Sequence, residues 1–293
     1  MLGGMKARRT MLGLSILGAL TCGLARASAE DTNSVQFSQP APYASDADIS
    51  RRFGYRIALP DYDITKEKFR LIVPAAYSTN SVWGLLVWLS PGDDAYVAPE
   101  WQEELANHRL ILVSPYKAGN DRHPVDRMRL ALDATCNIYK QFRIDRKRIV
   151  VGGFSGGARI ASMIGVAYGD MFPGTLCICG VNFYKHVPAA SGEFYLSSYM
   201  PTVAALLTAQ KSARFVLLTG ENDPNLDNLK SVYERGFKRE GFMNVLYLEV
   251  PGMNHALPEP KVLARALDYL VGTGVPPAAP ASAKSPGKAA ERP

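Results

Sequence analysis

The feature that most constrains the fold is a series of short apolar runs that are continuous rather than alternating. Strands buried on both faces have this pattern, because helices cover both sides of a parallel sheet. The strong runs are 85–89, 110–113, 149–151 and 215–218, and weaker ones are 176–180 and 245–250. Two earlier runs, 55–59 and 69–73, are expected to pair at an antiparallel edge of the sheet.

Apolar residues at helical spacing lie between these runs. The clearest stripes are 128–139, 160–167, 229–237 and 263–270. Alternating strands and helices predict an α/β fold, with a mostly parallel, doubly wound sheet and helices on both faces. Ligands bind at the carboxyl ends of the strands in such sheets, so catalytic residues are expected in the loops that follow the apolar runs.

The net charge of +6 comes from the two ends of the 293-residue chain. Residues 1–29 carry four basic residues and no acidic one, and residues 273–293 carry three basic residues and one acidic residue. The remaining 243 residues hold 26 basic and 26 acidic side chains. A neutral central region has no overall attraction for phosphate backbones, so we expect no nucleic-acid partner.

The first 29 residues resemble an export signal. Lys6, Arg8 and Arg9 precede an uncharged stretch of 14 residues, 11–24, and Ala27-Ser28-Ala29 fits a cleavage site. The stretch is shorter than the ~20 residues that span a bilayer, so no membrane span is expected after cleavage. The alternatives are cleavage after Ala25-Arg26-Ala27, export by a twin-arginine route, and an uncleaved membrane anchor.

Composition divides the rest of the chain into three parts. Residues 30–52 are expected to be an extended segment, residues 53–271 to form one catalytic domain, and residues 272–293 to be disordered. The last part is rich in Pro, Ala, Ser and Gly and has too few apolar residues to offset the entropy of ordering it.

A candidate nucleophile follows the run 149–151. Gly153-Phe154-Ser155-Gly156-Gly157 matches G-x-S-x-G between an expected strand and an expected helix, which is the context that the motif requires. The helix N-terminus would place free N–H groups beside Ser155. The alternatives are a glycine-rich turn with a solvated serine and a phosphate-binding turn, although the Lys-Ser/Thr pair of a P-loop is absent.

A serine needs a base and an acid to act as a nucleophile. Chain order after Ser155 leaves His186 and His255, and His255 lies in the loop between the run 245–250 and the last helix. Asp223, after the run 215–218, is the expected acid, with Glu221 and Asp227 as alternatives. The expected oxyanion donors are the N–H groups of Gly156 and Gly92, with Asp93 as the alternative to Gly92, because Pro91 has no N–H. Lining of the substrate cleft is expected from His123, Asn182, Tyr184 and His186.

These motifs resemble the α/β-hydrolase superfamily over about residues 53–271. Gly153–Ser162 and Cys179-Gly180-Val181-Asn182 are similar to exported esterases related to polyhydroxybutyrate depolymerases and feruloyl esterases. The resemblance implies the α/β-hydrolase fold and hydrolysis of carboxylic esters through an acyl-serine intermediate, without a metal or organic cofactor. The partner would be a small-molecule, glycan-linked or polymeric ester. Ser90-Pro91 stands where many relatives have His-Gly, and no large lid insertion is visible.

Two questions stay open at this point. The same triad would serve an acyltransferase or a serine peptidase, and an inactive hydrolase fold could be a secreted binding protein. Cys136 lies on the apolar stripe of a helix that could pack on the strand holding Cys177 and Cys179. A disulfide from Cys136 to either is one alternative, and three small buried thiols are the other.

Overall fold

The computed structural model describes residues 34–54 and 62–272. Within these residues, eight strands form one sheet in the order β1-β2-β4-β3-β5-β6-β9-β10. The first two strands are antiparallel to their neighbours, and all the others pair in parallel. The strands are β1 (Ser34–Gln36), β2 (Lys68–Ile72), β3 (Trp83–Leu89), β4 (Leu110–Pro115), β5 (Ile144–Phe154), β6 (Gly174–Ile178), β9 (Arg214–Gly220) and β10 (Val245–Val250).

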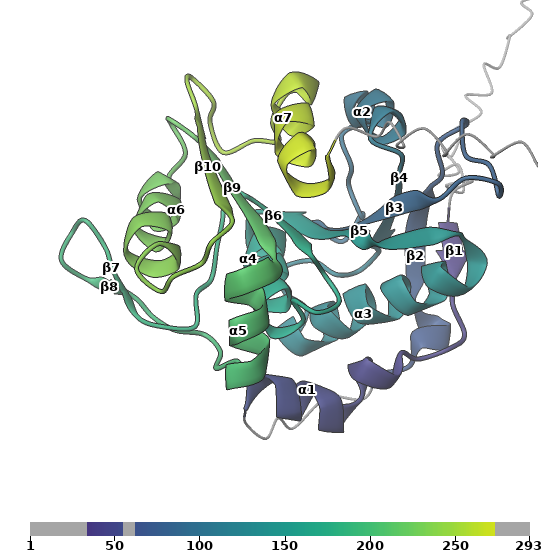
Figure 1. The fold of residues 1–293 in the computed structure, drawn as a ribbon, viewed down its shortest axis with the longest axis horizontal. Coiled ribbons are helices and arrows are strands. Elements are labelled where there is room, and N and C mark those ends of the chain that lie inside the picture. The colour runs from purple at the N-terminus through teal and green to yellow at the C-terminus, as the bar shows by residue number, and fades with distance from the viewer. Residues whose placement is uncertain (1–33, 55–61, 273–293) are drawn as a thin grey trace, which may run out of the picture. The chain divides into compact units, whose positions relative to one another are not determined.

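Helices cover both faces of this sheet (Figure 1). The α-helices are α1 (Asp46–Phe53), α2 (Gln102–Asn107), α3 (Pro124–Gln141), α4 (Gly156–Ala167), α5 (Val203–Ser212), α6 (Leu226–Ser231) and α7 (Pro260–Val271). Helices α3 and α4 pack on one face, and α2 and α7 pack on the other. Short helical turns are η1 (Pro42–Ala44), η2 (Ile64–Lys66) and η3 (Pro99–Trp101), and the π-helix η4 (Val232–Phe237) continues α6.

The predicted fold class is confirmed. Every residue of β3 and β4 is buried. This agrees with their continuous apolar runs, which predicted strands covered by helices on both faces. The predicted helical stripes lie on α3, α4, α6 with η4, and α7. Within the described residues no large lid is present, because the segment between β6 and α5 carries only a small hairpin of β7 (Val187–Pro188) and β8 (Phe194–Tyr195).

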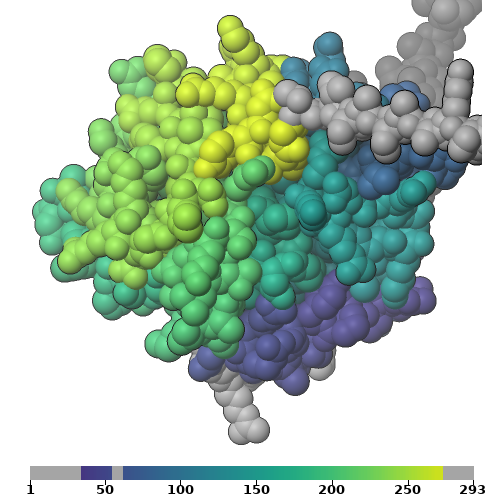
Figure 2. Space-filling view, in the orientation of Figure 1, coloured from purple at the N-terminus to yellow at the C-terminus, as the bar shows by residue number. Residues whose placement is uncertain are grey.

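The expectation of an extended segment at residues 30–52 is wrong for its described part. That part forms β1, η1 and all of α1 except its last residue, and it buries Phe37, Ala44 and Ile49 in the core. Figure 2 shows this purple segment packed along the teal and green residues that follow it. Ser45 begins α1 by accepting the N–H of Asp48, so the helix carries its own capping signal.

Several predictions lie outside the described residues, namely the export signal, the strand at 55–59 and the Pro-rich tail from residue 273. No helix among residues 34–54 and 62–272 is long and apolar enough to cross a membrane. The three cysteines of the described chain, Cys136, Cys177 and Cys179, are all free thiols, which favours the second of the two alternatives for them.

Candidate active site

Ser155 stands at a sharp turn between β5 and α4. Its backbone has φ 53° and ψ −118°, a conformation that L-residues rarely adopt. Two hydrogen bonds hold the turn, one from the N–H of Ser155 to the Ile178 carbonyl (2.8 Å) and one from the N–H of Arg159 to the Ser155 carbonyl (3.2 Å). The strained turn places the serine side chain at the carboxyl ends of the parallel strands.

Glycines make this turn sterically possible. A Cβ on Gly157 would lie 1.9 Å from the Leu89 carbonyl oxygen, and one on Gly153 would lie 2.4 Å from the carbonyl carbon of Gly157. A Cβ on Gly180 would lie 2.4 Å from the Ser155 carbonyl oxygen. Helix α4 therefore approaches β3 and the loop after β6 more closely than any side chain would allow.

Three side chains from separate loops form one hydrogen-bonded series. His255 Nε2 lies 2.9 Å from Ser155 Oγ, and His255 Nδ1 lies 2.8 Å from Asp223 Oδ1. An ionised carboxylate only accepts, so Nδ1 carries the proton and Nε2 of the neutral ring accepts from the serine hydroxyl. The series can take a proton from Ser155 and stabilise the resulting imidazolium.

The environment of Asp223 keeps its carboxyl group ionised. Burial by itself raises the pKa of Asp223, because its side chain is 0% exposed. Hydrogen bonds from the Cys179 thiol, the Asn225 N–H, His255 and Thr219 outweigh that effect, so the pKa of Asp223 lies below its ordinary value. The alternatives do not reach the histidine: Asp227 accepts from the Tyr195 hydroxyl (2.7 Å), and Glu221 accepts from the Gly252 N–H (2.9 Å).

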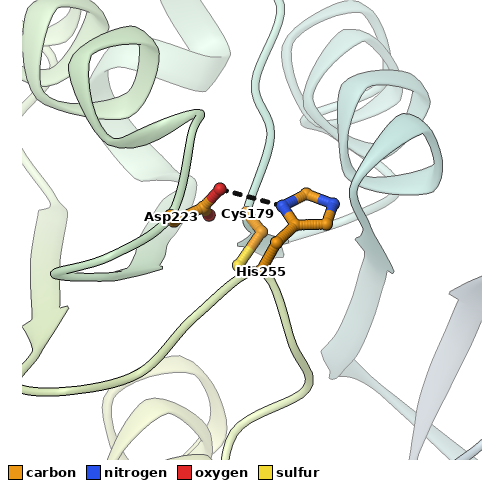
Figure 3. Close-up of side chains that lie close together, drawn as sticks. All are labelled: Cys179, Asp223 and His255. Carbon is orange, nitrogen blue, oxygen red and sulfur yellow. Dashed lines mark hydrogen bonds and ion pairs between the residues drawn. The ribbon is translucent and has the colours of Figure 1, made fainter.

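Cys179 completes the surroundings of the acid, as Figure 3 shows. Ligand atoms of Cys179, Asp223 and His255 all lie within 4.8 Å of one another, the one group of three such side chains in the described chain that is close enough to share a metal ion. Burial raises the pKa of the Cys179 thiol well above its ordinary value. A thiol that keeps its proton is a poor metal ligand, and the other two side chains are already hydrogen-bonded to each other.

A cavity of about 460 Å³ opens beside His255. Its lining is largely apolar and includes Trp88, Pro91, Tyr96, Phe154 and Leu257. The Phe154 ring lies against the imidazole of His255, with 4.9 Å between ring centroids. The cavity can take an apolar or aromatic group next to the serine, histidine and aspartate.

The two expected oxyanion donors differ in whether their N–H groups are free to bind an oxyanion. Gly156 is the first residue of α4, where its N–H has no acceptor within the helix. Gly92 lines the cavity, but its N–H already donates to Ser90 Oγ at 3.2 Å. The structure therefore leaves the Gly156 N–H free and engages the one predicted on Gly92.

The residues expected to line the substrate cleft separate into two groups. His123 and Asn182 line a second cavity of about 310 Å³, together with Met128, Ile160 and Met163. Asn182 Oδ1 also accepts from Arg159 (3.3 Å). Neither residue lines the cavity beside His255.

The prediction is wrong for Tyr184 and His186. Tyr184 is buried, and its hydroxyl donates to Glu240 (3.0 Å) while its ring packs against Phe183. His186 is exposed, and its Nδ1 accepts the N–H of Ser197 (2.9 Å). Neither residue lines the cavity beside His255, so a position shortly after β6 does not by itself bring a side chain to the site.

Four residues that surround the site were not predicted from the sequence. Thr219 and Cys179 hold the Asp223 carboxylate, and Asn120 and Arg127 lie beside Gly156 and the loop after β3. Thr219 precedes the expected acid in the chain, which is a usable signal for a supporting hydroxyl. Asn120 carries no such signal, because its place depends on how two loops pack.

No sequence-family profile and no curated protein matches this chain. Solved structures do resemble it. A feruloyl esterase module from Clostridium thermocellum matches with a TM-score of 0.55 and 13% identity, over 71% of this chain and 84% of that one. A ferulic acid esterase from Anaeromyces mucronatus matches with a TM-score of 0.53 and 16% identity, over 72% and 86%. A carboxylesterase cloned from a metagenomic library gives 0.53 and 17%, over 72% and 85%. The chain therefore has the α/β-hydrolase fold.

Proposed function

We propose that this chain is a serine hydrolase that cleaves carboxylic esters through an acyl-serine intermediate. The observation that carries the proposal is the hydrogen-bonded series from Asp223 through His255 to Ser155, with donor–acceptor distances of 2.8 and 2.9 Å. The strained turn at Ser155 and the apolar cavity beside His255 support it. The esterases among the structural neighbours support the fold on which this site is built.

In the acylation step, Ser155 Oγ attacks the ester carbonyl carbon while its proton passes to His255 Nε2. Asp223 holds the ring in the required tautomer and stabilises its positive charge. The carbonyl oxygen becomes an oxyanion that accepts from the Gly156 N–H. When the tetrahedral intermediate collapses, the bond to the alcohol oxygen breaks and His255 donates its proton to that oxygen.

Deacylation repeats these steps with water as the nucleophile. His255 Nε2 takes a proton from water, the hydroxide adds to the acyl carbon, and Ser155 Oγ leaves with the returned proton. The histidine has 31% of its side chain exposed, so water can reach it from the open side of the site. The product is a free carboxylic acid, and the residues themselves return to their starting protonation states.

The cavity indicates the class of ester. Its aromatic lining, from Trp88, Tyr96 and Phe154, fits an aromatic or short apolar group. Two of the structural neighbours are described as esterases of feruloyl or ferulic acid compounds, and one is described as complexed with sinapinate. We propose aromatic acyl esters, free or glycan-linked, ahead of polyesters of the polyhydroxybutyrate type.

We also propose that the protein is exported to the periplasm or the medium. The support is the charge and length pattern of residues 1–29. Expression of the full chain in a bacterial host, followed by N-terminal sequencing of exported protein, tests this. A mature chain that begins at Glu30 is expected, and protein that keeps its first residues and stays inside the cell contradicts it.

The test of the activity is hydrolysis by the purified chain of p-nitrophenyl esters with acyl groups of increasing length, and of methyl ferulate. Ser155→Ala should lower kcat by about 10⁶-fold and abolish labelling by a fluorophosphonate. Ser212→Ala is the matched control, because Ser212 is exposed at the end of α5, before β9 begins. It should keep the rate and the label.

Equal rates in wild type and Ser155→Ala would refute the serine mechanism. Two other outcomes would redirect it. Faster release of product to an added alcohol or amine than to water would identify an acyltransferase, and turnover of amides but not esters would identify a peptidase. Absence of both turnover and label would favour a binding protein on a hydrolase fold.

A further inference from the structure

The loop after β3 offers few free donors for an oxyanion. Pro91 has no N–H, and the N–H of Gly92 donates to Ser90 Oγ at 3.2 Å. In this fold the second oxyanion donor ordinarily comes from that loop, and the donor expected there, the N–H of Gly92, is already engaged.

The loop after β4 lies directly on the loop after β3. The N–H of Asn120 donates to the Pro91 carbonyl (2.9 Å), and the N–H of Lys117 donates to the Asp93 carbonyl (2.8 Å). The N–H of Gly119 donates to the Asp93 carboxylate (2.8 Å). Three hydrogen bonds therefore fix the backbone of residues 117–120 at the place where the second donor is expected.

The side chain of Asn120 extends from this loop to Gly156. A Cβ on Gly156 would lie 1.9 Å from Asn120 Oδ1 and 2.9 Å from Nδ2, so the amide occupies the space that any other residue at 156 would fill. Gly156 is also the residue whose N–H is the first oxyanion donor. Asn120 is an exposed residue.

A buried arginine orients the amide. Arg127 Nη1 donates to Asn120 Oδ1 (3.4 Å), and its Nη2 donates to the Ser90 carbonyl (3.2 Å). Arg127 is 3% exposed and makes no ion pair within residues 34–54 and 62–272, so its hydrogen bonds go to neutral oxygens. Burial lowers the pKa of Arg127 to about 10, which leaves it cationic at neutral pH. Because Oδ1 accepts from a cation, Nδ2 with its two hydrogens points away from Arg127.

We propose that the side-chain amide of Asn120 donates the second hydrogen bond to the oxyanion, in place of a backbone N–H from the loop after β3. The inference rests on the proposed function, because an oxyanion forms only if Ser155 adds to a carbonyl. Asn120 is then a catalytic residue, and Arg127 is a positioning residue that engages Oδ1 and leaves the two hydrogens of Nδ2 free to donate. The glycine at 156 serves both donors: it exposes its own N–H and leaves room for the amide.

Two substitutions separate a donor from a structural role. Asn120→Ala removes the amide, and Asn120→Asp keeps an acceptor for Arg127 while it removes the donor hydrogens. If Asn120 is a donor, both variants should lower kcat on the order of 100-fold with little change in KM, because the interaction is made only in the transition state. A trifluoromethyl ketone, which forms an oxyanion on the serine, should lose affinity by a similar factor.

Asn80→Ala and Asn80→Asp are the matched controls. Asn80 is exposed in the turn that precedes β3, so it lies near the amino ends of the parallel strands, whereas Ser155 follows the carboxyl end of β5. Both variants should keep the wild-type rate. Unfolding midpoints of all four variants show whether each is folded. Asn120→Asp should fold at least as well as wild type, because the new carboxylate faces the unpaired Arg127.

The outcomes distinguish this inference from the proposed function. An active wild-type enzyme whose Asn120→Asp variant turns over at the wild-type rate overturns the inference and leaves the serine mechanism intact. So does a loss in Asn120→Ala that Asn120→Asp restores, because the role is then only to accept from Arg127. Ser155-independent turnover, or none, removes both together.

Discussion

The close approach of α4 to β3 makes Gly157→Ala the most informative single change outside the reacting groups. The new Cβ would lie 1.9 Å from the Leu89 carbonyl oxygen. Carbon and carbonyl oxygen meet at about 3.3 Å, so the helix and the strand must separate by roughly 1.4 Å. Leu89 is the last residue of β3, and its carbonyl is part of the backbone, so no flexible side chain can absorb the movement.

Two effects set the size of the result. Overpacking of this kind costs about 1–3 kcal/mol, and the better helix propensity of alanine returns at most about 1 kcal/mol. The first turn of α4 carries the Gly156 N–H, so its displacement moves the oxyanion donor. A displacement of about 1 Å at a catalytic group can lower the rate by about 100-fold. We expect the free energy of unfolding to fall by about 1–2 kcal/mol and kcat/KM to fall on the order of 100-fold.

Urea unfolding and ester hydrolysis, measured on the same preparation, give both quantities. Gly236→Ala is the control, because the three atoms nearest its Cβ would all belong to the ring of Phe183, at 3.2–3.4 Å, and a side chain can yield by a few tenths of an ångström. It should keep its rate and its stability within a few tenths of a kcal/mol. Wild-type kcat/KM in a folded Gly157→Ala variant would refute the reasoning that this contact positions the donor.

Two further predictions concern charge. Because the pKa of Asp223 is lowered in the folded chain, its ionised form stabilises the fold above the unfolded value of about 3.9, and this contribution is lost as the pH falls through the lower folded pKa. The free energy of unfolding of Asp223→Asn, measured in urea, should therefore be lower than that of wild type at pH 6, and the difference between the two should narrow below about pH 4. A difference that does not change with pH would contradict this. Arg52 on α1 donates two hydrogen bonds to Asp170 (2.5 and 3.0 Å). Arg52→Met should therefore lower the free energy of unfolding by about 1 kcal/mol, and by less at high salt. An unchanged free energy of unfolding in low salt would show that the ion pair contributes nothing to stability.

The fold was predictable because its signals are local. Continuous apolar runs identify β3, β4 and β9, and apolar residues at helical spacing identify α3 and α7. Each of these elements can be recognised from a window of about ten residues. The strand order was not predicted, because right-handed crossovers fix the face on which each connection passes and not which strands are neighbours. The G-x-S-x-G motif was equally local, since the strained turn at Ser155 requires small residues on both sides.

The N-terminal helix was missed although its signals are present. Ser45 caps α1, Asp46 and Asp48 stand in its first turn, and Gly54 ends it in a left-handed conformation. Only Ile49 and Phe53 of its eight residues are large and apolar, so the stripe is two residues long and no periodicity can be measured. Such a helix is stable because it packs on the domain, which the sequence pattern does not contain.

Tyr184 was misplaced for a different reason. A residue six positions after the end of β6 can turn toward the site or away from it, and hydrophobic contacts decide which. Here Phe183 packs on Phe237 and Phe242, with ring centroids 5.0 and 6.1 Å away, and the ring of Tyr184 packs against Phe183 rather than in the cavity beside His255. Those partners lie more than 50 residues along the chain, beyond the reach of a local pattern.

The same limit explains why Asn120 was overlooked while Ser155, Asp223 and His255 were chosen. Each of these three follows its own strand, and chain order alone narrows the candidates. Asn120 reaches Gly156 only because two glycines allow it: a Cβ on Gly119 would lie 2.6 Å from the Asp93 carboxylate, and one on Gly156 would displace the amide. A glycine in the sequence indicates that another group approaches the backbone closely, but it does not identify that group. The sequence therefore shows the glycines of a site formed by two packed loops, whereas its hydrogen-bond donors can be identified only from the arrangement of those loops in the structure.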